Sequence, residues 1–240
     1  MAGAGHPVEA RPRREGNVVK KRWLLGLLSF NGGFVDTAGF LGLQGLFTAH
    51  VTGNFVTLGA ALAFGTKGVI AKLIALPEFI VVIALARLAG AAMTARGWPT
   101  LRILLAVKVL FLLAFFVLAV ALGPFPDSDV PAALLTGFTG IAAMAIQNAV
   151  QRVHYASFPP TTLMTGSTTQ AAIDAVDLMR GVGGEQGAVV RTRFRRMLAA
   201  IAWFAAGCAA AAALYVWVGF WCLAVPVVVG AATAIMRAED

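Results

Sequence analysis

The chain has 240 residues, of which 59% are hydrophobic and 12% are charged, and its mean hydropathy is +0.82. Soluble domains carry about twice that share of charged residues. The composition therefore excludes an ordinary soluble protein and predicts an all-α polytopic membrane protein with one membrane domain. The net charge of +8 comes largely from clusters that flank apolar stretches. This is the pattern of membrane-topology signals, so we expect no nucleic acid as a partner.

The first 22 residues are basic and precede an apolar stretch at about 23–46. A basic start is typical of signal peptides, but this stretch contains Asn31 and Asp36, and no convincing cleavage site follows it. We expect residues 1–22 to be a cytoplasmic tail and the stretch to be a retained membrane helix.

Asp36 lies deep in this first predicted helix, on one stripe with Gly32 and Gly39. The two glycines allow another element to pack against the carboxylate. A carboxylate buried in a membrane is costly and is a functional hypothesis by default. It could couple transport to H⁺ or Na⁺, or it could accept hydrogen bonds from the next segment. The sequence leaves both roles open.

The next segment, at about 50–64, is too short to cross a bilayer and begins with polar residues. A helix that starts inside the membrane has backbone N–H groups without partners, and these favour an anion or an electronegative ligand atom. We expect Thr52 to cap this helix start and Gly53 to allow close approach. Asn54 and His50 complete the candidate substrate-binding residues here, although a histidine at a chain break can equally be structural.

Two longer apolar stretches follow, at about 69–95 and 103–122. Glu78 lies near mid-depth in the first of them and is a second candidate for ion coupling. Lys108 lies in the second stretch, nearer an end, and we expect its side chain to snorkel toward the interface.

The second half of the chain repeats the arrangement of the first. After an apolar stretch at about 131–152, the segment FPPTTLMTGSTTQAAIDA, residues 158–175, matches FTAHVTGNFVTLGAAL, residues 47–62. Each has a Phe, a short polar or proline stretch, a Thr-Gly pair and a helix of small residues. The candidate substrate-binding residues of this half are Thr165, Gly166, Ser167, Gln147 and Asn148.

Two final apolar stretches, at about 199–217 and 218–236, are joined by a turn that must be tight. If each short segment dips into the membrane and returns to the same side, the basic loop 96–102 and the Arg-rich segment 180–196 both face the cytoplasm with the termini. The acidic loop 123–130 then lies outside, as the positive-inside rule favours. We expect six transmembrane helices and two short re-entrant half-helices.

The two membrane units are then residues 23–122 and 131–236. Each contains three crossings, so the second unit is inverted relative to the first. Inverted repeats with broken helices at matching positions indicate a binding site near the bilayer midplane of a secondary transporter.

The stretches GGFVDTAGFLGLQGLFTAHVTGNFVTLG and QNAVQR, together with FPPTTLMTGSTTQ, resemble the YoaK family of small bacterial integral membrane proteins. The resemblance covers about residues 23–236. It implies a six-helix protein of the bacterial inner membrane and supplies no substrate. Ser167 stands where the family resemblance leads us to expect Asn.

The sequence favours a secondary transporter or permease for a small polar or anionic solute, bound between the two half-helix starts and embedded in the lipid bilayer. The alternative is a non-transporting membrane scaffold or sensor. Sequence motifs of known enzyme classes are absent, and the three histidines are not placed to build a metal site. We therefore expect no enzymatic activity and no cofactor. A homodimer is one way for a protein of six crossings to present a stable moving interface.

Overall fold

The computed structural model describes residues 11–236, with side chains from residue 20 onward. Within this part of the chain every regular element is a helix, as the composition predicts. The elements are α1 (Arg11–Gly42), α2 (Gly53–Phe64), α3 (Val69–Ala95), α4 (Thr100–Leu122), α5 (Pro131–His154), α6 (Thr165–Met179), α7 (Gly184–Val218), the 3₁₀ helix η1 (Gly219–Leu223) and α8 (Ala224–Ile235). The predicted tail at 1–22 lies partly outside the described residues, and helix α1 already begins at Arg11.

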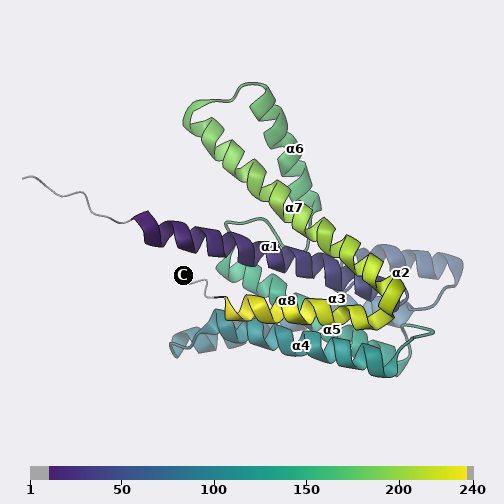
Figure 1. The fold of residues 1–240 in the computed structure, drawn as a ribbon. Coiled ribbons are helices and arrows are strands. Elements are labelled where there is room, and N and C mark those ends of the chain that lie inside the picture. The colour runs from purple at the N-terminus through teal and green to yellow at the C-terminus, as the bar shows by residue number, and fades with distance from the viewer. Residues whose placement is uncertain (1–10, 237–240) are drawn as a thin grey trace, which may run out of the picture.

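Five stretches of the described chain are long and apolar enough to cross a membrane: Lys20–Gly42, Val69–Ala95, Thr100–Leu122, Pro131–His154 and Gly184–Ile235. The last contains both α7 and α8. These helices are separated by η1, where Gly219 has a left-handed backbone conformation and the chain turns back (Figure 1). The predicted tight turn is therefore present. Helix α8 itself has 12 residues, which is short for a crossing.

Helices α1 and α5 form the centre of the bundle. In the most apolar windows of both helices 72% of residues are buried, against 33% or less in the other candidate spans. The outer helices instead expose large aliphatic side chains such as Leu88 of α3 and Leu110 of α4. In a membrane these side chains would contact lipid, which is as apolar as they are.

The central helices run in opposite directions and pack on different neighbours. Gln147 of α5 contacts Leu28 of α1, whereas Gly137 of α5 faces Leu46, just beyond the end of α1. Helix α1 packs mainly on α7, and α5 packs on α4 and α3. The α1–α7 crossing is close because Gly33 faces the backbone of Phe204 and Gly207 faces that of Phe30. Small residues at such crossings are typical of membrane helices.

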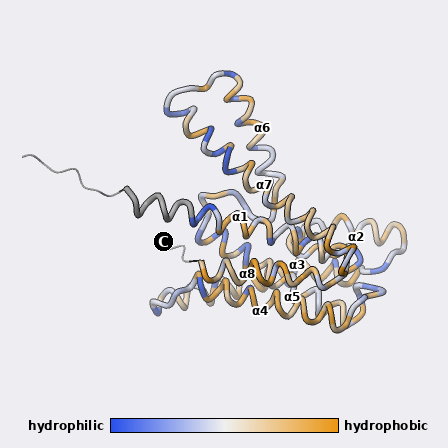
Figure 2. The backbone as a smooth tube through the Cα atoms, viewed as in Figure 1, coloured by the Kyte–Doolittle hydropathy of each residue, from blue (hydrophilic) through white to orange (hydrophobic). Residues whose placement is uncertain are grey.

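Helix α6 and the first part of α7 form a hairpin that leans away from the bundle (Figure 1). Helix α7 has 35 residues, which is about 52 Å at 1.5 Å per residue and exceeds the hydrocarbon thickness of about 30 Å. Hydrophilic residues gather in this hairpin, whereas the bundle is mostly hydrophobic (Figure 2). Arg193 of α7 donates from Nε to both carboxylate oxygens of Asp174 in α6, at 3.0 and 3.1 Å. This ion pair joins the two arms.

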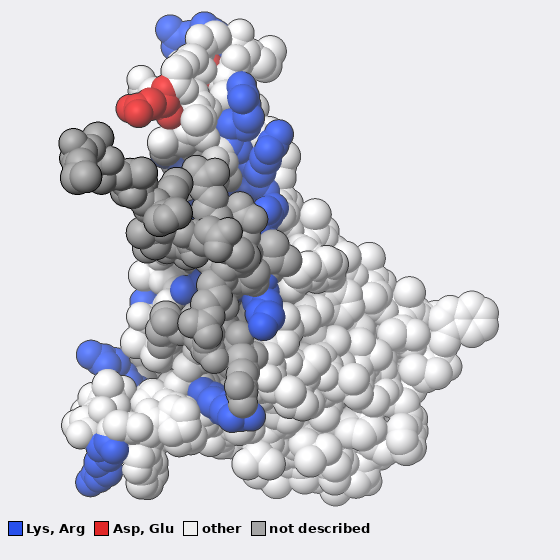
Figure 3. Space-filling view, turned by 60° about the vertical axis from the view of Figure 1, so that its left-hand side comes forward, with Lys and Arg blue, Asp and Glu red and all other residues white. Residues whose placement is uncertain are grey.

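The two ends of the bundle differ in their charged residues. Lys and Arg gather on one end and on the hairpin (Figure 3). We call this the basic end; its exposed arginines in the bundle are Arg22, Arg96, Arg102 and Arg152. At the opposite end the loop 123–130 meets the start of α3, where Asp129 accepts the N–H of Ala71 at 2.8 Å. The basic loop 96–102 and the acidic loop 123–130 thus lie at opposite ends, as predicted.

Candidate functional site

The loop between α1 and α2, residues 43–52, is held by Asp36 of α1. One carboxylate oxygen of Asp36 accepts the backbone N–H groups of Thr48, Ala49 and His50 at 2.9, 2.7 and 3.1 Å. Buried N–H groups outside a helix need an acceptor, and a carboxylate is the strongest that a side chain offers. Of the two roles left open for Asp36, the structure contains the hydrogen-bonding one.

Asn54, in the first turn of α2, holds the start of the same segment. Its side chain accepts the N–H of Phe47 at 2.8 Å and donates to the Phe47 carbonyl at 2.9 Å. Both polar atoms of the amide are therefore used within the protein. Thr52 precedes α2 but makes no side-chain capping bond in the described chain. The predicted capping bond from the Thr52 side chain is absent there, because the first N–H groups of α2 already bond to the backbone carbonyls of the preceding turn, residues 50–52.

The loop between α5 and α6, residues 155–164, is held by amide side chains of α5. Gln147 donates to the Leu28 carbonyl of α1 at 2.8 Å and to the Thr161 hydroxyl at 3.1 Å. The Asn148 carbonyl oxygen accepts the Thr162 hydroxyl at 2.8 Å. Gln151 donates to the carbonyls of Tyr155, Phe158 and Pro159. Sequence analysis missed Gln151, although it shares a helical face with Gln147.

Helix α6 begins at Thr165 itself, after Met164 in the capping position, and the Thr165 hydroxyl forms no cap. The predicted Thr165 cap is therefore also wrong. The buried Ser167 hydroxyl has no hydrogen-bond partner among the described residues. Apart from its own helix and chain neighbours, no atom of the described residues lies within 4 Å of a Cβ built on Gly166, so this glycine borders open space.

The two loops meet on the same stripe of α1, on either side of Asp36. A Cβ on Gly32 would lie 2.6 Å from the Thr161 carbonyl oxygen, and a Cβ on Gly39 would lie 2.8 Å from Thr48 Cγ2. The predicted packing of another element against this stripe is confirmed. Thr48 also faces α5, because a Cβ on Gly140 would lie 3.2 Å from its Cγ2. Each loop thus contacts the central helix of the other half of the chain.

A cavity of about 310 Å³ lies where the loops approach α3 and α5. It runs from Leu76 and Phe79 in the middle of α3 toward Arg87 and Arg152 near the basic end. The first loop contributes Ala49, Val51 and Thr52, and the second contributes Leu163. The remaining lining residues are Ile83, Asn148, Ala149 and Val153. Pockets of this size bind small solutes.

The cavity carries positive charge. Arg87 and Arg152 both line it, and in the part of the chain that the structure describes the ion pair Arg193–Asp174 is the single salt bridge. Neither guanidinium of the cavity is therefore neutralised by a carboxylate there. Thr52 and Asn148 add polar groups to a largely apolar wall.

The structure gathers a minority of the predicted site residues around this cavity. Thr52 and Asn148 line it. The other candidates do not: His50, Gly53, Asn54, Gln147, Thr165, Gly166, Ser167, Asp36 and Glu78. Glu78 is half-buried on α3, and its Oε2 has no hydrogen-bond partner among the described residues. His50 is half-buried beside the Phe47 ring, with ring centroids 6.0 Å apart. Whether any of these residues binds a solute or ion stays a prediction.

Lys108 differs most from its predicted environment. Its side chain is fully buried, and Nζ has no hydrogen-bond partner within the described residues. Phe115 of α4 packs on Gly140 of α5. Lys108 is two helical turns before Phe115 and Gln147 is two turns after Gly140, and because the two helices are antiparallel, Lys108 and Gln147 lie at the same level of the bundle. The expected snorkelling is wrong because this face of α4 packs on α5 and α8 rather than facing lipid. Across the described chain, His, Cys, Asp and Glu form no group of three that could hold a metal ion.

Comparison with known proteins identifies a family and a transmembrane relative. The model of a protein family described as "Protein of unknown function (DUF1275)" matches residues 24–236. The chain belongs to this family. UPF0700 transmembrane protein YoaK of Bacillus subtilis (strain 168) is 32% identical over 145 residues, which make up 60% of this chain and 62% of that protein. The YoaK resemblance is thus confirmed, and the chain is a polytopic membrane protein. No solved structure matches.

Proposed function

We propose that the protein is a secondary transporter or permease for a small anionic solute, which binds in the cavity between the two loops. The observation that carries this proposal is that the walls of the cavity come from both loops, with Thr52 at the start of α2 and Leu163 just before α6. A site shared by two matching broken segments can open to either side when one half of the protein moves against the other.

The helix packing supports an inverted repeat of α1–α4 and α5–α8. The first helix of each unit packs on the third and fourth helices of the other unit: α1 on α7 and α8, and α5 on α3 and α4. The second helix of each unit packs on its own third helix. The two first helices run in opposite directions, as inversion requires. In this proposal α7 and α8 are separate crossings, which gives six, and α2 and α6 are re-entrant half-helices.

The charges support an orientation in the bacterial inner membrane with both termini in the cytoplasm. Exposed arginines are concentrated at the basic end, and the positive-inside rule places such an end in the cytoplasm. The cavity then opens toward the cytoplasm through Arg87 and Arg152.

The positive charge of the cavity supports an anion over a neutral solute. A guanidinium facing a low-dielectric cavity binds carboxylate, phosphate or sulfate groups through paired N–H donors. The apolar wall formed by Leu76, Phe79 and Ile83 leaves room for a small organic part. Asp36 and Glu78 remain the candidates for coupling to H⁺ or Na⁺.

A non-transporting scaffold or sensor is the second candidate, and one observation favours it. Asp36 and Asn54 both use their side chains to hold the first loop, as residues of purely structural importance would. In a scaffold the cavity would be a packing defect filled by lipid, and no soluble anion would affect stability.

A thermal-shift screen of the purified full-length protein separates the two candidates. The probes are inorganic phosphate, sulfate, acetate and pyruvate, with glycerol as the neutral control. A transporter should be stabilised by at least one anion, by roughly 2.7 kcal/mol at about 100 times the Kd. The double variant Arg87→Gln/Arg152→Gln should lose this response, and Arg102→Gln, at the basic end but outside the cavity, should keep it.

Uptake of the stabilising anion into proteoliposomes then completes the test. The transport proposal fails if no anion raises the melting temperature of the wild type by more than it raises that of the double variant. It also fails if an anion binds but radiolabelled anion never crosses the proteoliposome membrane.

A further inference from the structure

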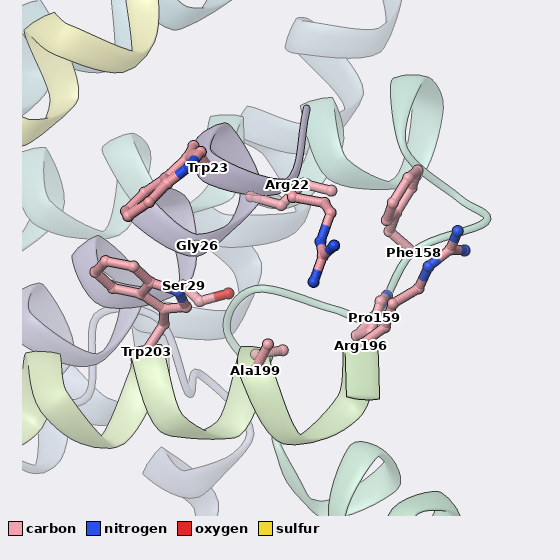
Figure 4. Close-up of a pocket in the computed structure, with 11 residues that line it drawn as sticks. Arg22, Trp23, Gly26, Ser29, Phe158, Pro159, Arg196, Ala199 and Trp203 are labelled. Carbon is pink, nitrogen blue, oxygen red and sulfur yellow. The ribbon is translucent and has the colours of Figure 1, made fainter. Parts of the chain in front are cut away.

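A second pocket, of about 280 Å³, lies between α1, α7 and the loop 155–164 (Figure 4). Its walls come from residues 22–29 of α1 and 196–203 of α7, together with Phe158 and Pro159 of the loop. It shares no lining residue with the cavity described above. The pocket therefore needs an explanation of its own.

One end of this pocket is cationic. Arg22 points into it, and Arg196 lies at its edge (Figure 4), with its guanidinium 4.8 Å from the centroid of the Phe158 ring. Neither arginine forms a salt bridge within the described residues, where Asp174 pairs with Arg193 instead. Two guanidinium groups at one mouth attract a phosphate or another anion.

The rest of the pocket is apolar and aromatic. The Trp203 ring lies over Gly26, where a Cβ would be 2.6 Å from the indole Nε1. Trp23 meets Trp203 edge to face, with ring centroids 5.7 Å apart. Leu25, Ala199 and Ala200 form the remaining apolar wall. A residue larger than glycine at position 26 would displace the Trp203 ring.

The polar and apolar parts are ordered along the lengths of α1 and α7. Helices α1 and α7 run in the same direction here, because Gly26 faces Trp203 while Gly33, further along α1, faces Cys208, further along α7. Arg22 and Arg196 thus lie nearest the basic end, and Ser29 and Trp203 lie about 10 Å deeper at 1.5 Å per residue. Trp23, of which 54% is exposed, has the position typical of a tryptophan at the membrane interface.

We propose that this pocket binds one anionic phospholipid from the leaflet at the basic end. The phosphate lies between Arg22 and Arg196, and one acyl chain follows Leu25, Ala200 and Trp203 toward the bilayer centre. A soluble anion would use the cationic mouth but leave the apolar wall empty, whereas a zwitterionic lipid would add a like charge beside the arginines. This inference does not depend on the transport proposal.

The test measures lipids retained by the purified full-length protein, using native mass spectrometry after exchange into nanodiscs of phosphatidylcholine with or without one quarter phosphatidylglycerol. The variants are Arg22→Gln/Arg196→Gln, which removes the charges, and Ala200→Phe, which fills the apolar wall and keeps them. Arg102→Gln is the matched control, because it removes an exposed arginine of the same end that does not line the pocket. Glycerol 3-phosphate is the soluble competitor.

We expect the wild type and Arg102→Gln to retain one phosphatidylglycerol in preference to phosphatidylcholine. The double arginine variant should bind it about 25-fold more weakly, since each of the two basic residues near an anionic membrane surface contributes about a factor of five. Ala200→Phe should also lose it, and millimolar glycerol 3-phosphate should not displace it. Any of three results would overturn the proposal: the wild type retains both lipids equally, both pocket variants retain phosphatidylglycerol as the wild type does, or glycerol 3-phosphate displaces it.

Discussion

The carboxylate of Asp36 accepts the backbone N–H of Ala49 at 2.7 Å, and the same oxygen also accepts the N–H groups of Thr48 and His50. A buried helix residue thereby fixes the loop that leads into α2. Because Gly32 and Gly39 receive the two loops on either side of it, Asp36 lies where the two halves of the chain meet. Its hydrogen bonds position the wall of the cavity to which Ala49, Val51 and Thr52 contribute.

Asp36→Asn should lower the free energy of unfolding by about 1–3 kcal/mol, because bonds to a charged acceptor become bonds to a neutral one. The measurement is unfolding in mixed detergent micelles. Asp177→Asn, near the end of α6, is the control and should change stability little. Unaltered stability in Asp36→Asn would mean that the carboxylate does not hold the loop.

Lys108→Met should stabilise the protein by about 1 kcal/mol or more, because it removes a buried amino group without a hydrogen-bond partner in the described chain. Lys72→Met is the matched control and should destabilise, since Lys72 Nζ donates to the carbonyls of Gln44 and Lys67 at 3.3 and 3.2 Å. The same unfolding assay compares them. A stabilised Lys108→Met protein that has also lost anion uptake would identify Lys108 as functional. A loss of stability would show that Lys108 has a partner.

Gly32→Ala should destabilise by about 1–3 kcal/mol because its Cβ would overlap the Thr161 carbonyl oxygen, and overpacking costs this much. Gly59→Ala is the opposite case. Gly59 lies inside α2, and apart from its chain neighbours and its own helix backbone no atom of the described chain lies within 4 Å of an added Cβ, so the change should stabilise by about 0.5–1 kcal/mol through helix propensity. Equal effects at the two positions would contradict the close contact between α1 and the second loop.

Much of this site follows from sequence patterns, for definite physical reasons. The short helices α2 and α6 begin at the two Thr-Gly motifs because the polar residues before them cannot continue an apolar membrane helix. The glycine stripe around Asp36 predicts contact, because glycines spaced along one face of a membrane helix serve close approach. The separation of the two ends follows from the positions of the charges.

Other features depend on which helix faces meet, and a single sequence does not supply this. Lys108 is buried because α5 and α8 cover its face of α4, although its distance from the helix end suggested snorkelling. The first N–H groups of α2 bond to carbonyls of residues 50–52 rather than to the Thr52 hydroxyl, and α6 begins at Thr165 itself, with Met164 in the capping position. Helix α7 begins at Gly184, before its apolar part, and its Arg193 pairs with Asp174 of α6, a contact that hydropathy does not reveal.

Cysteine labelling tests the proposed orientation of the membrane helices. With Cys208 and Cys222 replaced by Ala, a membrane-impermeant maleimide should label Lys67→Cys in intact cells and Arg96→Cys only after permeabilisation. Both side chains are exposed and lie at opposite ends of the bundle. Labelling of both from one side would contradict the inverted arrangement.

The central claim is that each loop packs on the central helix of the other half, and disulfide formation between Thr48→Cys and Gly140→Cys tests it most directly. The Thr48 Cγ2 lies 3.2 Å from a Cβ built on Gly140, which suits a disulfide, whereas cysteines with Cα atoms more than about 7 Å apart cannot pair. In a background without native cysteines, mild oxidation in membranes should cross-link this pair. It should not cross-link Thr48→Cys with Ala133→Cys, because position 133 lies about 10 Å from position 140 along the axis of α5. Failure of the first pair, or equal cross-linking of both, would contradict the account.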